Sequence, residues 1–332
     1  MAMLVDVRSS ARLHLGFYTI SGGYTAYGSI GVAIERPRVT VQVRRSKRVK
    51  IRNLTRVKVE QDVEEVIRSL NLPGAYVEVP EAIPKHVGLG STTQTRLSVA
   101  YALSRAYGMN WNVRRLAFAL RRGWVSGIGV AAFERGGFIL DSGRILRDGR
   151  VHEPKSCNEL PKIMYRRTLP EDWYFVVAVP KGIRGLDERE EKPLLEAPET
   201  DRKLECELHE AVLLCMLPAL ARGDAESFGK ALTKVQRLVG RYFSKYQGGE
   251  FCCWETEELV KALLEGGAYG AGQSSWGPTA YGLVEGREMA KRLLESTLKS
   301  AERMGVESEI FVAKVRNSGF SFKLVKTDGA KT

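Results

Sequence analysis

The sequence predicts an α+β protein of two domains. Apolar and polar residues alternate over residues 3–17 and 31–45, as they do in half-buried strands. Helical patterns follow, and then a polar segment with several prolines precedes a second set of strands and helices. The chain has 332 residues, which is too long for one ordinary core. We place the boundary near residue 168, which gives an N-terminal domain of residues 1–168 and a C-terminal domain of residues 169–326.

In the N-terminal half, a third strand is predicted over residues 75–84. The stretch "STTQTRLSVAYALSRAYG", residues 91–108, has a broad apolar stripe at helical spacing and ends at a glycine. A second helix is predicted over residues 113–124. The chain then turns through Gly136 and Gly137 into a short strand.

In the C-terminal half, residues 174–180, "YFVVAVP", predict a buried strand. An acidic loop dotted with lysines comes next, followed by two or three helices over residues 204–246. A helix at 256–267, a glycine-rich loop, a helix at 287–305 and a last strand at 309–315 complete the pattern. This rhythm is typical of an antiparallel sheet backed by helices.

Composition excludes several classes of protein. The longest apolar run, residues 211–221, is interrupted by Pro218 and is shorter than the roughly 20 residues that a membrane helix needs. Charged residues interrupt the first apolar stretch, so it does not predict a secretion signal. Five cysteines without a CxxC pair and four histidines without HExxH do not indicate a zinc site. We therefore expect a cytoplasmic protein.

The net charge of +12 indicates an anionic partner or a solvated basic surface. Much of the charge lies in residues 44–58, "RRSKRVKIRNLTRVK", where basic and apolar residues alternate. A solvated strand face is the first interpretation and a nucleic-acid surface the second. The stretch has no aromatic residue on which a base could stack. A substrate with several phosphates would benefit equally from a positive field.

Two glycine-rich loops are candidates for binding phosphate. In "PKHVGLGSTTQ", residues 84–94, glycines and three hydroxyl side chains precede a helix. That order is typical of an anion cradle, although serine and threonine also cap ordinary helices. The loop is not a Walker motif, because no GK[ST] follows the glycines. The second loop, "GAGQSSWGPT" at residues 270–279, is either a tight hairpin turn or part of the same site.

Four segments together resemble the ordered motifs of the GHMP kinase superfamily. They are "SARLHLGF", "PKHVGLGSTTQTRLSVAYAL", "SGIGVAAFERGGFILDSG" and "GAGQSSWGPTAYG", and they span almost the whole chain. Within the superfamily the sequence is most similar to the β-ribofuranosylaminobenzene 5'-phosphate synthases of archaeal methanopterin biosynthesis. The resemblance implies a two-domain GHMP-kinase-like fold. Its N-terminal domain would contain a left-handed βαβ unit around the phosphate loop, and its C-terminal domain would be ferredoxin-like.

One position departs from the kinases of this superfamily. Many of them carry a catalytic aspartate in an SGxD segment, whereas this chain has Gly129 there. Loss of a positioned base lowers a rate by about 10²–10⁴. Glu134 or Asp141 would serve instead if the alignment slipped, and homoserine-kinase-like members manage without the aspartate. Asp141 is otherwise a turn residue, and no metal ligand is assigned.

The resemblance implies a decarboxylating phosphoribosyl transfer, in which a para-hydroxy- or para-aminobenzoate attacks phosphoribosyl pyrophosphate with release of carbon dioxide and pyrophosphate. It also implies Mg²⁺ or another divalent cation, small-molecule substrates and a homodimer. An ATP-dependent small-molecule kinase is the alternative, and a basic nucleic-acid-binding protein is a more distant one.

Site residues follow from the same resemblance. Arg12 and His14 would meet the benzoate carboxylate or the sugar phosphate, and Lys85 and His86 would neutralise the charge of the leaving group. A satisfied core histidine and solvated surface charges are the alternative interpretations. Residues implied in binding pyrophosphate are Gly88, Leu89, Gly90, Ser91, Thr92 and Thr93. Residues implied in closing the site from the second domain are Gly272, Gln273, Ser274, Ser275 and Trp276, of which the tryptophan would stack on the ring or plug the domain interface.

Overall fold

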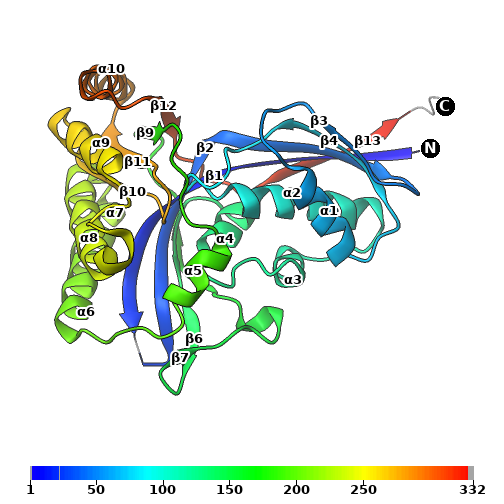
Figure 1. Ribbon diagram of the computed structural model, residues 1–332, viewed down its shortest axis with the longest axis horizontal. Helices are drawn as coiled ribbons and strands as arrows, with labels where there is room; N and C mark the ends of the chain where they lie inside the picture. The colour runs from blue at the N-terminus through cyan, green and yellow to red at the C-terminus, as the bar shows by residue number, and fades with distance from the viewer. Residues whose placement is uncertain (1, 22, 328–332) are drawn as a thin grey trace.

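A long hairpin forms the spine of the molecule in the computed structural model, which describes residues 2–21 and 23–327 (Figure 1). Its strands are β1 (Ala2–Ser21) and β2 (Thr25–Arg45). Both strands run from the N-terminal half, where α1 to α3 lie, to the C-terminal half, where α6 to α9 lie (Figure 1). Most of their alternating apolar side chains are fully buried, which explains why two strands of this length stay paired across three register shifts.

The first sheet has nine strands and is built around this hairpin. The main path runs in the order β13-β1-β2-β4-β3, and β5 to β8 pair beyond it along the other end of β2. The additional strands are β3 (Lys50–Asn53), β4 (Ala75–Glu81), β5 (Phe138–Asp141), β6 (Arg144–Arg147), β7 (Arg150–Val151), β8 (Ile163–Arg167) and β13 (Ser321–Thr327).

Helices of the N-terminal half cover this sheet and carry the first glycine loop. The α2 helix packs against both strands of the hairpin, and its buried residues are spread around most of its circumference. Their bounds are α1 (Glu60–Ser69), α2 (Ser91–Ala106), α3 (Val113–Ala119) and α4 (Ile128–Glu134). The first glycine loop therefore lies between β4 and α2, as predicted.

The second sheet is antiparallel and has the strand order β10-β11-β9-β12. Its strands are β9 (Trp173–Pro180), β10 (Gly270–Gln273), β11 (Ala280–Glu285) and β12 (Ser308–Lys314). Helices separate the first strand from the second and the third from the fourth, which is the βαββαβ arrangement of a ferredoxin-like domain. The ferredoxin-like prediction is thus confirmed.

The C-terminal half has several helices, of which the last three pack on the second sheet. The helices are α5 (Glu188–Leu194), α6 (Arg202–His209), a π-helical stretch (Glu210–Met216), α7 (Leu217–Arg222), α8 (Ala225–Gln247), α9 (Trp254–Glu265) and α10 (Arg287–Met304). No helix among the described residues is both long and apolar enough to cross a membrane.

Among the elements that differ from the sequence predictions, two matter for the site and the first sheet. The acidic segment predicted as a loop contains α5, which begins at a capping box formed by Asp187 and Glu190. The chain also continues past the last predicted strand into β13, which pairs with residues 2–8 of β1. Strands on either side of residue 168 lie in different sheets, but the segment assigned to the C-terminal domain ends by returning to the first sheet.

Candidate active site

The first glycine loop presents free backbone donors at the start of α2. Gly90 precedes the helix with a left-handed φ of 80°, and no side chain caps the helix. The hydroxyl groups of Ser91, Thr92 and Thr93 therefore do not fill the N-terminal N–H groups, which remain available together with the positive end of the helix dipole. This arrangement favours an anion cradle over an ordinary capped helix.

The two glycine loops pack directly on each other. The Ser274 hydroxyl donates to the Gly88 carbonyl oxygen at 2.6 Å and accepts the His14 N–H at 3.0 Å. A Cβ atom at Gly88 would lie 2.1 Å from the Ser274 carbonyl oxygen, and one at Gly277 would lie 2.2 Å from the Gly88 nitrogen. Glycine is required at both positions because backbone meets backbone there, and the second loop is therefore part of the same site.

Arg12 links the hairpin to the first loop. Its backbone N–H donates to the Leu89 carbonyl oxygen at 3.2 Å, and its Nη1 donates to the Gly88 carbonyl oxygen at 2.5 Å. Burial lowers the pKa of Arg12 to about 10, so the guanidinium stays charged at neutral pH. Its Nε is buried and has no hydrogen-bond acceptor among the described residues.

His14 is a neutral buried side chain. Burial, assisted by the positive charge of Arg12, lowers the pKa of His14 to about 3. Its Nδ1 accepts the Gly16 N–H at 3.3 Å, so the proton of the neutral ring is on Nε2. The sheet register shifts on both sides of the pair, between Ser10 and Arg12 and between His14 and Gly16. Bulges of this kind aim side chains at a site.

A cavity of about 330 Å³ lies over the first glycine loop, and we call it the loop cavity. Its lining brings together most of the residues that the sequence predicted. Those that line it are Arg12, His14, Lys85, His86, Gly88, Gly90, Ser91, Thr92, Thr93 and Ser275. Two predicted residues act elsewhere: the Leu89 side chain is buried in the core, and Gly272 packs on Gln236 of α8.

Lys85 and His86 come just before the first glycine loop and have different surroundings. Lys85 Nζ lies 2.6 Å from Asp62 Oδ2, and Asp62 also receives Arg96 Nε at 2.8 Å. Part of the positive charge of Lys85 is therefore balanced before any ligand arrives. His86 has a left-handed φ of 57°, and burial, with the nearby Arg184, lowers its pKa below the ordinary value.

A smaller cavity of about 50 Å³ adjoins the loop cavity and has aromatic walls; we call it the aromatic cavity. Trp276 packs edge-to-face on Phe243 with ring centroids 4.8 Å apart, and Phe17 packs on the same ring at 5.8 Å. His14 and Ser275 line both cavities. Predicted residues in the aromatic cavity are Gln273, Ser275 and Trp276, whereas Ser274 holds the two loops together.

Sequence reasoning missed several residues at these cavities, and two of them show why. Glu191 of α5 lines both cavities, and Arg122 lines the loop cavity, where its Nε donates to Thr93 Oγ1 at 3.2 Å. The charge run around Glu191 was visible in the sequence, but a run of acidic residues does not show which one faces a cavity. Arg122 is one of a pair of arginines near the end of the helix predicted over residues 113–124, whereas the observed α3 ends at Ala119.

Gly129 occupies a place from which a side chain would face the phosphate loop. A Cβ atom there would lie 3.2 Å from Thr93 Cγ2, and Gly129 lines the loop cavity. Asp141 does not replace the missing carboxylate, because it is buried and its oxygens accept the N–H groups of Ser29, Gly127 and Gly143. Neither Asp141 nor Glu134 lines the loop cavity.

The chain matches the N-terminal domain of the GHMP kinases over residues 57–137 and their C-terminal domain over residues 216–300. It is 30% identical to a β-ribofuranosylphenol 5'-phosphate synthase from Archaeoglobus fulgidus, over 97% of this chain and 100% of that one. It is 29% identical to a protein of the same name from Methanothermobacter thermautotrophicus, over 86% of this chain and 90% of that one.

A solved structure confirms the fold. The crystal structure of homoserine kinase from Cytophaga hutchinsonii superposes with a TM-score of 0.69, covering 96% of this chain and 97% of that one. Sequence identity to it is 17%, so this likeness concerns the fold alone. The two-domain GHMP-kinase-like fold predicted from the motifs is confirmed.

Proposed function

The chain belongs to the β-ribofuranosylphenol 5'-phosphate synthase family, pentosyltransferases with the GHMP kinase fold, and from this premise we propose that it catalyses a decarboxylating phosphoribosyl transfer. The donor would be phosphoribosyl pyrophosphate and the acceptor a para-substituted benzoate. The phenol in the relatives' name favours para-hydroxybenzoate over para-aminobenzoate.

Arg12 is the observation that carries the proposal. The Arg12 side chain is partly exposed, but its Nε–H is buried and has no hydrogen-bond acceptor among the described residues, and a buried donor without an acceptor is costly. The group lies beside the Gly88 carbonyl and lines the loop cavity, where the first turn of α2 also leaves its N–H groups free. An anion bound there would accept hydrogen bonds from the Arg12 Nε–H and from the N–H groups of the first turn of α2. Pyrophosphate has the negative charge and enough acceptor oxygens to do so.

In the proposed reaction, the ring carbon that bears the carboxylate attacks the anomeric carbon of the ribose. The carbon–oxygen bond to pyrophosphate breaks, and pyrophosphate leaves with its electron pair. The carbon–carbon bond to the carboxylate then breaks, and its electrons restore the aromatic ring as carbon dioxide departs. No base has to take a proton from the ring carbon, so Gly129 in place of an aspartate does not hinder this reaction.

The acceptor ring would lie at the junction of the loop cavity and the aromatic cavity. The aromatic cavity alone is too small, because a cavity of about 150 Å³ is the size known to bind benzene. The ring would therefore enter edge-first and lie against the Phe243–Trp276 pair, whose rings already contact each other, with the neutral His14 donating a hydrogen bond from Nε2. Glu250 also lines this cavity and would accept the proton of the para hydroxyl group.

Magnesium would enter with the pyrophosphate. The described residues contain no cluster of three metal-ligating side chains. Magnesium commonly keeps several waters and binds mainly through substrate phosphates, so the proposal does not need such a cluster. Hydroxyl groups of Ser91 and Thr92 are the oxygen donors that the loop offers it. When bound, the ion would stabilise the charge on the leaving pyrophosphate.

A kinase of the same fold is the second candidate, because a solved homoserine kinase shares the fold over nearly the full length. Gly129 argues against a kinase that needs a carboxylate at this position, because the position faces Thr93 of the loop and carries none. It does not count against a homoserine-kinase-like enzyme, which manages without the aspartate. A nucleic-acid-binding role loses support as well. In the basic stretch, Arg44 stacks on Tyr76, and Arg52 pairs with Glu78 at 3.1 Å.

The test is incubation of the protein with phosphoribosyl pyrophosphate, MgCl₂ and either para-hydroxybenzoate or para-aminobenzoate. We expect carbon dioxide and pyrophosphate in equal amounts. Absence of both with either acid, together with ADP formation from ATP and homoserine or mevalonate, would overturn the proposal in favour of the kinase.

An Arg12→Met variant sharpens this experiment. It removes the guanidinium but keeps the length and apolar stem of the side chain, so we expect turnover to fall by at least about 10²-fold through lost charge stabilisation. Arg292→Gln, an exposed charge on α10, is the matched control and should retain full turnover. Equal activity of the two variants would remove Arg12 from the site.

A further inference from the structure

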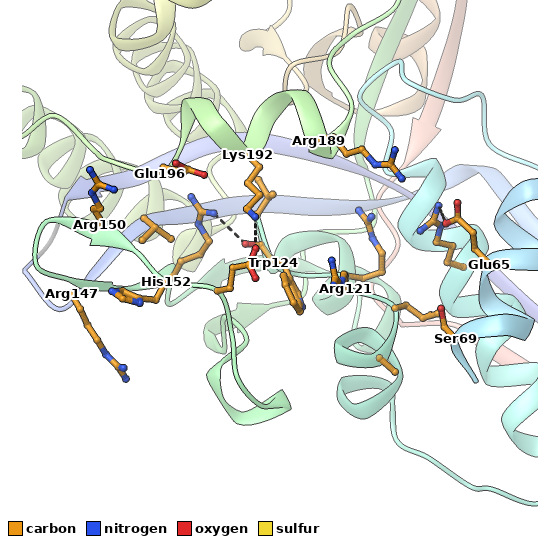
Figure 2. Close-up of a pocket in the computed structure, with 18 of the residues that line it drawn as sticks. Glu65, Ser69, Arg121, Trp124, Arg147, Arg150, His152, Arg189, Lys192 and Glu196 are labelled. Carbon is orange, nitrogen blue, oxygen red and sulfur yellow. Dashed lines mark hydrogen bonds and ion pairs between the residues drawn. The ribbon is translucent and has the colours of Figure 1, made fainter. Parts of the chain in front are cut away.

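A third and larger cavity opens beside the loop cavity, and nothing in the proposed reaction has used it. It measures about 890 Å³ and lies between α1, α5 and the β6–β7 hairpin (Figure 2). We call it the basic chamber, because nine arginine and lysine residues line it against four acidic ones. These cationic residues are Arg68, Arg96, Arg121, Arg122, Arg144, Arg147, Arg150, Arg189 and Lys192.

Some of these cations are already neutralised. Lys192 pairs with Glu153, and Arg96 pairs with Asp62 and Glu65. Others have no carboxylate partner among the described side chains: Arg68, Arg121, Arg147, Arg150 and Arg189. Unpaired like charges that line one concave surface repel each other, so a bound anion would stabilise the chamber.

The chamber is joined to the phosphate loop. Arg122 and Arg189 line both cavities, and Arg122 Nε donates to the Thr93 hydroxyl of the loop at 3.2 Å. Figure 2 shows Arg121 and Arg189 on the side of the chamber where Glu65 lies, and Glu65 also lines the loop cavity. Arg147 and Arg150 lie at the opposite end (Figure 2). A ligand on the loop can therefore extend into the chamber past three arginines.

The two cavities that adjoin the loop cavity differ sharply in charge. No lysine or arginine is among the described residues that line the aromatic cavity, which has Glu191 and Glu250 instead. A pentosyl donor of the proposed kind carries a diphosphate on C1 and a monophosphate on C5. With the diphosphate on the loop, a monophosphate that extends beyond the loop cavity enters one of these neighbours, and of the two only the basic chamber offers it cations.

We propose that the mouth of the basic chamber is the subsite for the 5-phosphate of the pentosyl donor, held by Arg121, Arg122 and Arg189. The inference rests on the proposed function. It assigns the diphosphate of the donor to the loop cavity and the 5-phosphate to the basic chamber. Arg121 is held near the mouth by its contact with the Trp124 ring, whose centroid lies 5.2 Å from the guanidinium carbon. The outer arginines, Arg147 and Arg150, extend the positive field that attracts the donor.

The test separates the two phosphate ends by titrating them one at a time. Ribose 5-phosphate and inorganic pyrophosphate are each titrated calorimetrically into the wild type and into Arg121→Asn, Arg189→Gln and the double variant. Asparagine is chosen at position 121 because the backbone has a left-handed φ of 54°, which asparagine tolerates. Arg292→Gln is the control for loss of one exposed charge.

For ribose 5-phosphate we expect the dissociation constant to rise about tenfold in each single variant and further in the double variant, because charge-assisted hydrogen bonds are lost. For pyrophosphate it should change by less than about threefold. Ser91→Ala should show the reverse pattern. The KM for phosphoribosyl pyrophosphate should rise in the chamber variants with kcat nearly unchanged.

Failure of this inference can be told from failure of the proposed function. If product forms but the chamber variants keep the wild-type affinity for ribose 5-phosphate, or the wild type does not bind it at all, the subsite is wrong and the function stands. If ribose 5-phosphate binds through these arginines but no carbon dioxide is released, the subsite stands and the reaction is wrong.

Discussion

At the scale of single residues, charge state decides what the site can do. Arg12 and His14 are two residues apart on β1, where Arg12 is partly buried and His14 is buried, but one is charged at neutral pH and the other is not. The arginine can therefore hold an anion, while the histidine is limited to donating one hydrogen bond. Because the pKa of His14 is about 3, its titration should not contribute to an activity profile between pH 5 and 9.

Asp141 is a buried carboxylate that has a structural role and does not line the site. Substitution Asp141→Asn replaces one acceptor oxygen with an amino group that faces backbone N–H donors, so we expect a loss of about 1–3 kcal/mol in unfolding free energy. The loss should be identical with and without MgCl₂. Asp172→Asn, at an exposed site, is the control, and urea unfolding is the measurement.

The pH dependence of this effect has a definite sign. Burial raises the pKa of Asp141 to about 6, above its ordinary value of 3.8, despite the N–H donors around it. The neutral form is therefore favoured in the folded state, and the stability that it contributes is lost as pH rises through 6. The destabilisation caused by Asp141→Asn should be larger at pH 5 than at pH 7.5. A difference that grows with pH would contradict this account.

At the scale of elements, the site depends on two loops that meet through glycine. Ala at Gly88 would place its Cβ 2.1 Å from the Ser274 carbonyl oxygen, with a left-handed φ of 90°. We expect Gly88→Ala to cost roughly 3 kcal/mol of unfolding free energy, since overpacking and the left-handed backbone both contribute. Gly277→Ala should cost a similar amount through packing alone.

A control and a double variant isolate the loop contact. Gly248→Ala has a φ of 80° with no atom near the new Cβ, so it measures the backbone penalty alone, which is about 1 kcal/mol. Gly88 and Gly277 share one contact, so the double variant should be destabilised by less than the sum of the single ones. Strict additivity in urea unfolding would show that the loops do not support each other.

The sequence was sufficient to predict the loops but not their contact. Periodicity predicted β1, β2 and α2, and the glycines with hydroxyl residues marked residues 84–94 and 270–279. That Gly88 packs on Gly277 depends on how the two sheets meet, and spacing along the chain carries no signal for that. The place of Glu191 could not be predicted for a similar reason, because a run of charged residues has no periodicity that shows which side chain faces a cavity.

At the scale of the whole molecule, the last described strand pairs with the first strand. The last strand, β13, pairs with residues 2–8 of β1, so the end of the second half completes the first sheet. The sequence prediction missed this strand, although Phe320, Phe322 and Leu324 alternate with other residues there. The two halves are thus joined three times, by the long hairpin, by the glycine loops and by this returning segment.

Removal of the returning segment tests how far the first sheet depends on it. The Phe320 ring stacks on Phe133 with centroids 4.4 Å apart and meets the Tyr101 ring edge-on at 4.4 Å. A chain that ends at Asn317 loses these contacts and exposes the edge of β1. We expect its Tm to fall by roughly 5–10 °C and its tendency to aggregate to rise.

A chain that ends at Thr327 keeps the whole strand and is the control for shortening the protein. Phe320→Ala keeps the backbone pairing but loses the ring contacts, so it should lower the Tm without increasing aggregation, because the edge of β1 stays covered. Scanning calorimetry and light scattering separate the two effects. Aggregation of Phe320→Ala to the same extent as the chain ending at Asn317 would mean that ring packing, and not strand pairing, protects the sheet edge.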